Sequence, residues 1–279
     1  MQGKTVAITG ATSGIGEAAA LALAKAGARI VFTARNATKG SAMLDRLRAA
    51  NSTAAHALVA ADLSTIAGMK TAAAAIAAEA PAIDVLANNA GAYFDTRAET
   101  ADGLERTFAV NHMAYFVVTE LLRPNLTADA RIVSTSSAGH VLGRVDFDDL
   151  QSKRGYGAMR VYGFSKLLNI LWTRELARRL AGTGVTANCF HPGGVNTGFG
   201  AESRGPMALL LNLARPLLLT PEKGADTLVY LASSPEVIGK TGGYWTRRRR
   251  LEPSAAARDD ASGRRLWEES ASIAGLPIA

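Results

Sequence analysis

Short runs of β-branched and apolar residues alternate with longer Ala- and Leu-rich segments from the first residues of the chain. The short runs are apolar throughout, which is typical of parallel strands buried on both faces of a sheet. Repeated β-α units of this kind predict an α/β fold with a Rossmann-type, doubly wound parallel sheet. Strands are expected at 4–9, 29–34, 56–60, 83–88, 131–135, 185–190 and 243–246.

Helices are expected between and after these strands, at 14–26, 38–50, 64–79, 104–126, 161–180, 206–215, 221–233 and 255–274. No stretch reads as a linker, so residues 1–279 are predicted to form a single NAD(P)-binding domain. Within it, residues 198–220 are predicted to be a small helical substrate lid and residues 250–279 a C-terminal helical extension. In such a sheet, ligands bind beyond the carboxyl ends of the strands.

The chain has a single cysteine, Cys189, which excludes an internal disulfide and a cysteine cage for a metal. The first residues lack the basic region, apolar core and cleavage site of a signal peptide. No run of about 18 apolar residues occurs, so no transmembrane helix is expected. We therefore expect a cytoplasmic protein without a metal site.

The net charge is +7 and the isoelectric point is near 9.7, with four consecutive arginines at Arg247 to Arg250. Such basicity indicates either a solvated basic face or attraction to a polyanion. We expect no nucleic-acid partner, and the role of the arginine run stays open.

The first strand ends in a glycine-rich turn, Thr9-Gly10-Ala11-Thr12-Ser13-Gly14-Ile15-Gly16, that runs directly into a helix. Its glycines allow a tight turn and a close approach of backbone to a diphosphate, and the helix N-terminus offers free N–H groups. A purely structural turn is the alternative. Because the turn follows the first strand of a β-α series, it favours nucleotide binding.

The second strand indicates which nucleotide is bound. An NAD enzyme usually has an acidic residue at this strand end, about 20 residues beyond the glycines. Here the strand ends in Thr33-Ala34-Arg35-Asn36, without a carboxylate. Arg35 can pair with a 2′-phosphate through a planar, charge-assisted fork, or it can simply face solvent. NADP(H) is therefore preferred, with NAD(H) as the alternative.

Two further loops fit the same pocket. Asp62 and Leu63 follow the third strand, where a carboxylate can accept from an adenine amino group; capping of the next helix by Asp62 or Ser64 is the alternative. The sequence from Asn88 to Gly91 follows the fourth strand, and its small residues would let the backbone approach a ribose. An Asn-rich structural turn is the alternative there.

Tyr162 and Lys166 lie four residues apart near the start of a helix and therefore share a face. A lysine cation close to a phenol lowers its pKa and makes it a better acid-base catalyst at neutral pH. A Tyr–Lys pair at this spacing is also common on exposed helix surfaces without a catalytic role. Two serines, Ser136 and Ser137, end the fifth strand, where a hydroxyl can hydrogen-bond a substrate carbonyl. Asn111 lies in an otherwise apolar helix, where it should hold a water or a backbone group.

These motifs together resemble the short-chain dehydrogenase/reductase family over essentially the whole chain. The matching segments are TGxxxGIG at 9–16, NNAG at 88–91, Asn111, the strand-end serine, YxxxK at 162–166 and HPG at 191–193. The resemblance implies an oxidoreductase whose catalytic group is Asn111, Ser137, Tyr162 and Lys166. Ser137 is chosen because the family motif places its serine second of the pair.

The implied mechanism transfers hydride between the nicotinamide and a carbonyl carbon, with Tyr162 as acid and base. Lys166 would hold the nicotinamide ribose and, with Asn111 and water, resupply the proton. The resemblance and the loops give this set of cofactor contacts: Gly10, Ser13, Gly14, Ile15, Gly16, Arg35, Asn36, Asp62, Leu63, Asn89, Ala90, Gly91, Tyr162, Lys166, Pro192, Gly193, Val195 and Thr197. His140 and His191 are expected to be structural.

The spacing of the catalytic motifs refines the match. Tyr162 follows Ser137 by 25 positions, whereas the family usually has about a dozen residues there. This insertion resembles the retinol dehydrogenase-like subgroup, although that subgroup often has an N-terminal membrane anchor that this sequence lacks. Family resemblance also implies a homodimer or homotetramer through the helices that contain Asn111 and Tyr162.

The apolar segment from Met207 to Leu219 predicts a hydrophobic aldehyde or ketone, or the matching alcohol, as substrate of a carbonyl reductase. An amphipathic helix packed on the core, or a shallow membrane contact, would use the same residues. A second function remains open, because a fold does not fix function. That function is a nucleotide-sensing or interaction protein that uses the basic patch for an anionic partner.

Overall fold

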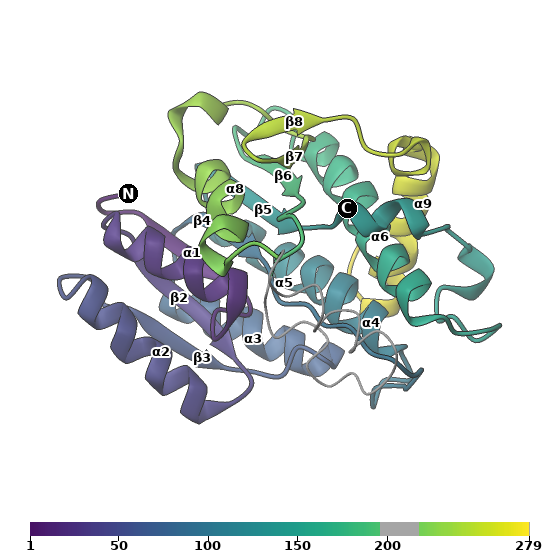
Figure 1. Cartoon of the computed structure of the whole chain (residues 1–279), viewed down its shortest axis with the longest axis horizontal. Helices are drawn as coiled ribbons and strands as arrows, with labels where there is room; N and C mark the ends of the chain where they lie inside the picture. Colours follow the sequence, from purple (N-terminus) through teal and green to yellow (C-terminus); the bar gives the residue numbers. More distant parts are fainter. Residues whose placement is uncertain (196–217, 279) are drawn as a thin grey trace.

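The computed structural model describes residues 1–195 and 218–278, and these form one eight-stranded sheet with helices on both faces (Figure 1). The strand order is β3-β2-β1-β4-β5-β6-β7-β8, and all neighbours run parallel except β7 and β8. The predicted doubly wound parallel sheet is thus confirmed. The strands are β1 (Thr5–Ile8), β2 (Arg29–Ala34), β3 (Ala57–Ala60), β4 (Ile83–Asn88), β5 (Leu126–Thr135), β6 (Thr186–Phe190), β7 (Tyr244–Thr246) and β8 (Arg249–Leu251).

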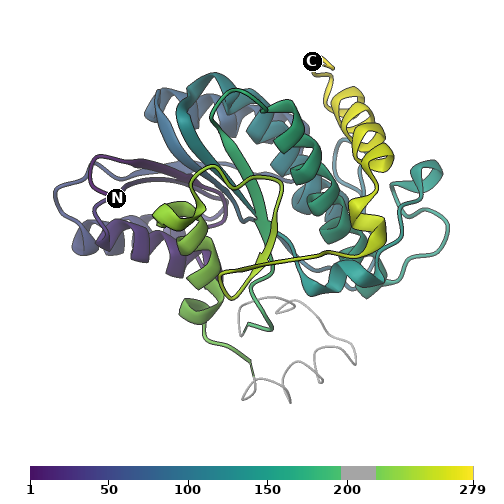
Figure 2. The same ribbon diagram turned by 90° about the horizontal axis from the view of Figure 1, so that it is seen from above.

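Two apolar cores lie on opposite faces of this sheet. The helices of the first core are α3 (Ile66–Glu79), α5 (Ala114–Leu122), α6 (Ala158–Arg179) and α9 (Asp260–Ala274). Those of the second core are α1 (Gly14–Lys25), α2 (Ala37–Ala50) and α8 (Pro221–Ser233). The parallel strands are buried by both layers, as their unbroken apolar runs predicted. Figure 2 shows α9 lying beside α6 on the first face.

Several helices begin where a short polar side chain replaces a missing backbone partner. Asn36 accepts from the backbone N of Lys39 at 2.9 Å at the start of α2, and Thr65 accepts from Gly68 at 3.1 Å at the start of α3. Asp259 caps α9 in the same way. Such caps satisfy the free N–H groups of a first helical turn. The predicted helix 64–79 therefore starts two residues later, because Thr65 is the cap rather than Asp62 or Ser64.

The predicted helix 104–126 is wrong at both ends. Glu105 caps a short helix, α4 (Arg106–Phe108), which continues through the π-helical turn η1 (Ala109–Met113) into α5. Pro124 lies in a following 3₁₀ turn, and Leu126 already pairs with Ile83 as the start of β5. The strand is longer than the predicted 131–135, because β4 pairs with two stretches of β5 on either side of a register shift.

The C-terminal region also differs from the expectation. The predicted helix 255–274 is split by Asp259 into a 3₁₀ turn, η7 (Ala255–Arg258), and α9. The arginine run forms a hairpin between β7 and β8, with Arg247 and Arg248 at positive φ (47° and 61°) in the turn. Arg248 pairs with Asp226 of α8, and β8 carries exposed arginines on a sheet edge, where charge opposes edge-to-edge pairing.

Two expectations fall on parts of the chain that the structure does not describe. The predicted helix 206–215 lies outside the described residues, and so does most of the predicted lid, 198–220. Among the residues that are described, no helix has the length and apolarity needed to cross a membrane.

Candidate active site

The glycine-rich turn after β1 has the backbone shape that the sequence predicted. Gly10 and Gly14 have φ of 71° and 58°, in the left-handed region that favours glycine. A Cβ on Gly16 would overlap the Gly10 carbonyl and the Asn89 side chain, so no larger residue fits there. Ser13 occupies the cap position of α1 without making a side-chain cap, which leaves the N–H groups of the first helical turn without that partner. This arrangement fits a phosphate group.

The loop after β4 is clamped onto that turn. The Asn89 side chain donates to the carbonyls of Thr9 at 3.2 Å and Gly10 at 3.0 Å. In return, the Thr9 hydroxyl accepts from the backbone N of Asn89 at 3.0 Å and of Ala90 at 3.1 Å. The structure therefore brings the predicted residues Asn89 and Ala90 against the glycine turn, and it adds Thr9, which the cofactor prediction left out.

The predicted adenine end lies over β2 and β3, which are neighbours in the sheet. Arg35 is exposed and makes no hydrogen bond or ion pair with another described residue, so its guanidinium is available for a ligand. Asn36 caps α2, and Asp62 accepts from the backbone N of Ser64 at 2.9 Å. Leu63 is buried. Asn36 and Asp62 thus have structural partners of their own, whereas Arg35 has none among the described residues.

Ser137 and Tyr162 meet beyond the end of β5. Ser137 caps a 3₁₀ turn, η3 (Ala138–Leu142), with its Oγ accepting from the Gly139 backbone N at 3.0 Å. A Cβ on Gly139 would lie 3.4 Å from that Oγ and 3.7 Å from a ring carbon of Tyr162. A hydrogen bond between the Ser137 and Tyr162 side chains favours the phenolate and acts to lower the pKa of Tyr162. The ring of Tyr93 packs edge-on against Tyr162, with the centroids 6.1 Å apart.

Lys166 is buried behind Tyr162. Its Nζ donates to the carbonyl of Thr135, the last residue of β5, at 3.3 Å, and lies 5.6 Å from the Tyr162 ring centroid. Burial lowers the pKa of Lys166 to about 7 and raises the pKa of Tyr162 to about 12. The sequence predicted that the lysine lowers the tyrosine pKa; in the structure, burial has the larger effect and raises it, and the Ser137 hydroxyl opposes that rise.

Asn111 lies in the π-helical turn η1 and is fully buried. Its Oδ1 accepts from the Ala92 backbone N at 2.8 Å, and its Nδ2 donates to the Ala92 carbonyl at 2.9 Å and to the Ser165 hydroxyl at 3.0 Å. Of the predicted partners, a backbone group is the one found. A Cβ on Gly91 would lie 3.3 Å from Asn111 Oδ1 and 3.4 Å from Lys166 Nζ. Asn111 therefore holds the loop that passes directly over the lysine.

The loop after β6 carries the predicted nicotinamide contacts. Gly193 has φ of 90°, and a Cβ there would overlap the side chain of Leu219. Val195 approaches Gly224 at the start of α8, a glycine that also lies beside Ile15 of the first loop. Pro192 joins these residues on the same strand end, whereas the predicted contact Thr197 lies outside the described residues.

The two histidines near the site have structural partners. His140 Nδ1 donates to the Ser137 carbonyl at 2.8 Å, and its Nε2 accepts from the Ser254 backbone N at 3.1 Å. His191 Nδ1 accepts from the Gly193 backbone N at 3.3 Å. Burial lowers the pKa of both imidazoles, which favours their neutral forms.

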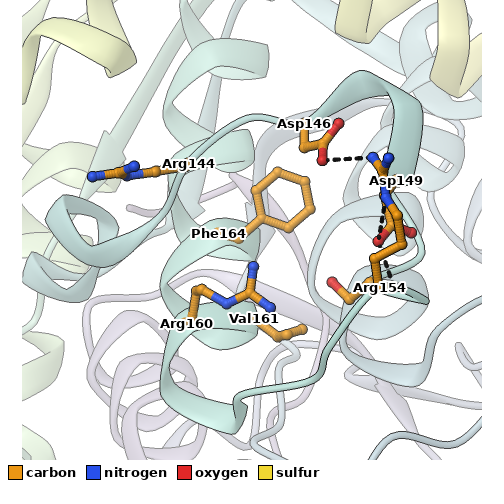
Figure 3. A pocket seen from close by; sticks show the side chains of 8 residues that line it. Arg144, Asp146, Asp149, Arg154, Arg160, Val161 and Phe164 are labelled. Carbon is orange, nitrogen blue, oxygen red and sulfur yellow. Dashed lines mark hydrogen bonds and ion pairs between the residues drawn. The ribbon is translucent and has the colours of Figure 1, made fainter.

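A separate surface pocket of about 50 Å³ lies at the insertion between Ser137 and Tyr162 (Figure 3). Arg154 forms ion pairs with Asp146 and Asp149 at its edge, and Arg144 and Arg160 also line it. Its lining contains none of the four predicted catalytic residues. The pocket is small and polar, so it does not suit a hydrophobic carbonyl compound.

Comparison with known proteins agrees with this geometry. The family model described as short chain dehydrogenase matches residues 4–207. This chain belongs to the short-chain dehydrogenase family. Members of this family use nicotinamide cofactors and interconvert C=O and CH–OH groups, so this short-chain dehydrogenase is an oxidoreductase.

The relatives of this short-chain dehydrogenase place it in the retinol dehydrogenase-like subgroup. It is 39% identical to human retinol dehydrogenase 14, over 99% of this chain and 88% of that protein. It is 40% identical to a Streptomyces protein provisionally named daunorubicin C-13 ketoreductase, over 99% and 94% of the two chains. A solved short-chain dehydrogenase from Burkholderia cenocepacia, in complex with NADP, superposes with a TM-score of 0.70 at 27% identity over 88% of this chain and 96% of that one.

Proposed function

We propose that this protein is an NADP(H)-dependent reductase of hydrophobic aldehydes and ketones, with Tyr162 as the proton donor. The observation that carries the proposal is the grouping of Ser137, Tyr162 and Lys166 at one strand end, directly beside a glycine turn suited to phosphate. Burial of a lysine amine beside a phenol lowers the stability of the fold. Titratable groups with perturbed pKa values concentrate at functional sites, so this burial favours a catalytic role.

The residues present fit a nicotinamide cofactor. The glycine turn, with Gly16 tightly packed, would hold the diphosphate, and Gly91 places no side chain beside Lys166 Nζ, which would bind a ribose hydroxyl. The cofactor, when bound, supplies hydride to the carbonyl carbon. Arg35, free of partners among the described residues, is our proposed ligand for a 2′-phosphate.

This chain's own residues would handle the proton. The Ser137 hydroxyl donates to the substrate carbonyl oxygen and orients it toward Tyr162. Tyr162, whose pKa near 12 keeps it protonated at neutral pH, gives its proton to that oxygen. Lys166, when protonated, stabilises the phenolate that remains. In this proposal Asn111 is a positioning residue, because its side chain is occupied by Ala92 and Ser165.

A hydrophobic substrate is proposed because aliphatic and aromatic side chains border the site. Leu218 and Leu219 pack against Gly194 and Gly193, and Tyr93 packs against Tyr162. Two relatives bear names of an alcohol, retinol, and of a ketone at C-13 of daunorubicin. A cytoplasmic location remains a prediction.

In place of the homodimer or homotetramer that the family resemblance implied, we propose a monomer, because α9 covers α6 and presents Trp267 to Phe116 of α5, which obstructs pairing through these helices.

The alternative of a binding protein with a basic patch is not favoured. Arg248 of the arginine run pairs with Asp226, and its guanidinium lies 5.7 Å from the ring centroid of Tyr230. At least this arginine has an intramolecular role.

The test is NADPH consumption at 340 nm against a panel of aldehydes and ketones of increasing apolar size. Wild type should show turnover that rises with apolar size, and Tyr162→Phe should lose roughly 10²- to 10⁴-fold in kcat, the usual contribution of general acid catalysis. Unchanged turnover in Tyr162→Phe would exclude the proposed role.

A further inference from the structure

The carbonyl of Thr135 is shared by two buried donors. Lys166 Nζ donates to it at 3.3 Å, and the side-chain Nδ2 of Asn169 donates to it at 3.2 Å. Lys166 and Asn169 are three residues apart on α6, so they present the same face to the end of β5. Lys166 is 3% exposed and Asn169 is fully buried, which means that this carbonyl is their shared polar anchor away from solvent.

A second polar contact lies directly behind Asn169. His112 of η1 and Ser270 of α9 are both fully buried, and His112 Nε2 and Ser270 Oγ are 2.9 Å apart. The residue before His112 in the sequence is Asn111, whose side chain holds the loop over Lys166. The π-helical turn therefore carries one residue that faces the site loop and one that faces the C-terminal helix.

Two buried atoms without a hydrogen-bond partner among the described residues lie between these two contacts. They are His112 Nδ1, which can donate, and Asn169 Oδ1, which can only accept. The nearby Asn169 side chain acts to raise the pKa of His112 and so opposes the effect of burial, which lowers that pKa to about 4. A neutral His112 with its proton on Nδ1 accepts from Ser270 through Nε2 and presents a donor that complements the Asn169 Oδ1 acceptor.

We propose that Asn169 is a positioning residue for Lys166 and that the C-terminal helix holds it in place through Ser270 and His112. This inference rests on the proposed role of Lys166 in proton transfer. It assigns α9 a function in the chemistry of a site that α9 itself does not touch.

Ser270, His112 and Asn169 are expected to affect the pKa of Lys166 because Asn169 and Lys166 donate to the same carbonyl. A carbonyl oxygen that accepts from Asn169 is fixed in direction and has less negative charge to offer to a second donor. The titratable side chains that face Lys166 are Tyr162 on α6 and Tyr115 on α5, and burial raises the pKa of both. Both are therefore uncharged at neutral pH, as is His112. Burial lowers the pKa of Lys166, and the Thr135 carbonyl accepts a hydrogen bond from its amine, so we expect the availability of this carbonyl to modulate the pKa.

The packing of α9 explains why Ser270 reaches this place. Trp267 packs edge-on against Phe116 of α5, with the ring centroids 5.1 Å apart, and the guanidinium of Arg179 lies 4.4 Å from the centroid of its ring. Ser270 follows Trp267 by three positions and so lies one helical turn further along the same face. The packing of Trp267 thus positions α9 so that Ser270 lies next to His112.

The test follows the Lys166 amine itself rather than turnover alone. Protein labelled with ¹⁵N-lysine is titrated by NMR without cofactor, with Lys166→Met to assign the signal. The variants are Asn169→Leu, which removes both contacts of the amide at similar volume, and Ser270→Ala, which is small enough to preserve folding. The control is Thr173→Val, which removes a buried α6 hydroxyl that donates to the Asn169 backbone carbonyl at 2.7 Å and makes no hydrogen bond with the Asn169 side chain among the described residues.

In wild type the Lys166 amine should titrate near pH 7. In Asn169→Leu the Thr135 carbonyl is left to Lys166 alone, so the pKa of Lys166 should rise by at least about 0.5 unit. Turnover should fall roughly fivefold or more in kcat, with the Kd for NADPH within about twofold of wild type, since misplacement of a reacting group lowers kcat. Ser270→Ala should shift both quantities in the same direction by a smaller amount.

Identical Lys166 titrations in Asn169→Leu, Ser270→Ala and Thr173→Val would overturn the inference, and so would a fall in the pKa of Lys166. If Asn169→Leu does not fold, Ser270→Ala decides by the same titration. Because the titration needs no cofactor or substrate, it separates this inference from the proposed function, which fails only if Tyr162→Phe keeps its turnover.

Discussion

The glycine turn after β1 and the polar cluster after β5, which contains Lys166 and Asn169, lie on the same edge of one sheet. The turn depends on backbone groups, whereas the cluster depends on side chains. The turn consists of backbone: Gly10 and Gly16 leave no space for side chains, Gly14 has a positive φ, and Asn89 holds the turn through the main-chain carbonyls of Thr9 and Gly10. The cluster consists of buried side chains, with Lys166 and Asn169 sharing one carbonyl.

This difference determines what a substitution should do in each region. A larger residue in the glycine turn creates overlap with backbone that cannot move away, so it should cost stability and cofactor binding together. The amine of Lys166 in the cluster is buried at a cost to stability, so its replacement by an apolar side chain should stabilise the fold while it abolishes function. Opposite signs of the change in stability therefore distinguish the two regions.

A loss of both stability and cofactor binding is expected for Gly16→Ala. Its new Cβ would overlap the Gly10 carbonyl oxygen and the Asn89 amide, which should lower the free energy of unfolding by about 1–3 kcal/mol. Thermal unfolding should show a lower Tm, and fluorescence titration should show NADPH affinity at least roughly tenfold weaker, equivalent to about 1.4 kcal/mol. Gly157→Ala is the matched control, because its Cβ would meet only the Arg160 side chain, at 3.8 Å and beyond. Equal Tm values and equal NADPH affinities in the two variants would contradict the claim that overlap with backbone at Gly16 causes both losses.

The opposite sign is expected for Lys166→Met. Burial lowers the pKa of Lys166 to about 7 from 10.5, so the unfolded chain binds more protons between these pH values and wild-type stability rises with pH across them. The variant should therefore be more stable than wild type by on the order of 2–4 kcal/mol at pH 6–7. This advantage should disappear near pH 10, and turnover should be lost.

Urea unfolding at pH 6.5 and pH 10 measures this difference. Lys223→Met, which changes an exposed lysine of α8, should leave stability nearly unchanged at both pH values. A Lys166→Met protein less stable than wild type at pH 6.5 would mean that the lysine supports the fold, contrary to the proposed contrast.

A smaller effect, with no change in stability, is expected for Arg35→Asp. Arg35 is exposed and has no partner among the described residues, so Tm should stay within about 1 °C of wild type. The Kd for NADPH should increase roughly 10- to 100-fold, and the preference should move toward NADH, because the carboxylate repels a 2′-phosphate and can accept from a ribose hydroxyl. Arg144→Asp, an exposed arginine at the separate surface pocket, is the control. Unchanged cofactor preference in Arg35→Asp would leave the choice of NADP without support.

The sequence predicted the parts of this edge that depend on local pattern. The glycine spacing, the buried parallel strands and the YxxxK pair are each visible within a few residues, and the structure brings them to one edge. The sequence pattern did not predict the hydrogen-bond partners of Lys166. Thr135 acts through its carbonyl, which every residue has, and Asn169 gains its role only when α6 packs against β5.

The C-terminal region shows the same limit. The π-helical turn that points Asn111 and His112 to different partners depends on α4, α5 and α9 packing together, which no helical periodicity reveals. The β8 strand was missed because four arginines favour neither a turn nor a strand. Arg247 and Arg248 adopt positive φ in the structure, with Arg248 held by Asp226 and lying over Tyr230.

The most direct test of the account is a single-turnover experiment with Tyr162→Phe. Enzyme saturated with NADPH is mixed with excess ketone in a stopped-flow instrument, and the loss of absorbance at 340 nm reports hydride transfer without product release. The account predicts that Tyr162→Phe binds NADPH with a Kd within about twofold of wild type but oxidises it at least roughly 10²-fold more slowly. Oxidation at the wild-type rate would contradict the assignment of Tyr162 as the proton donor.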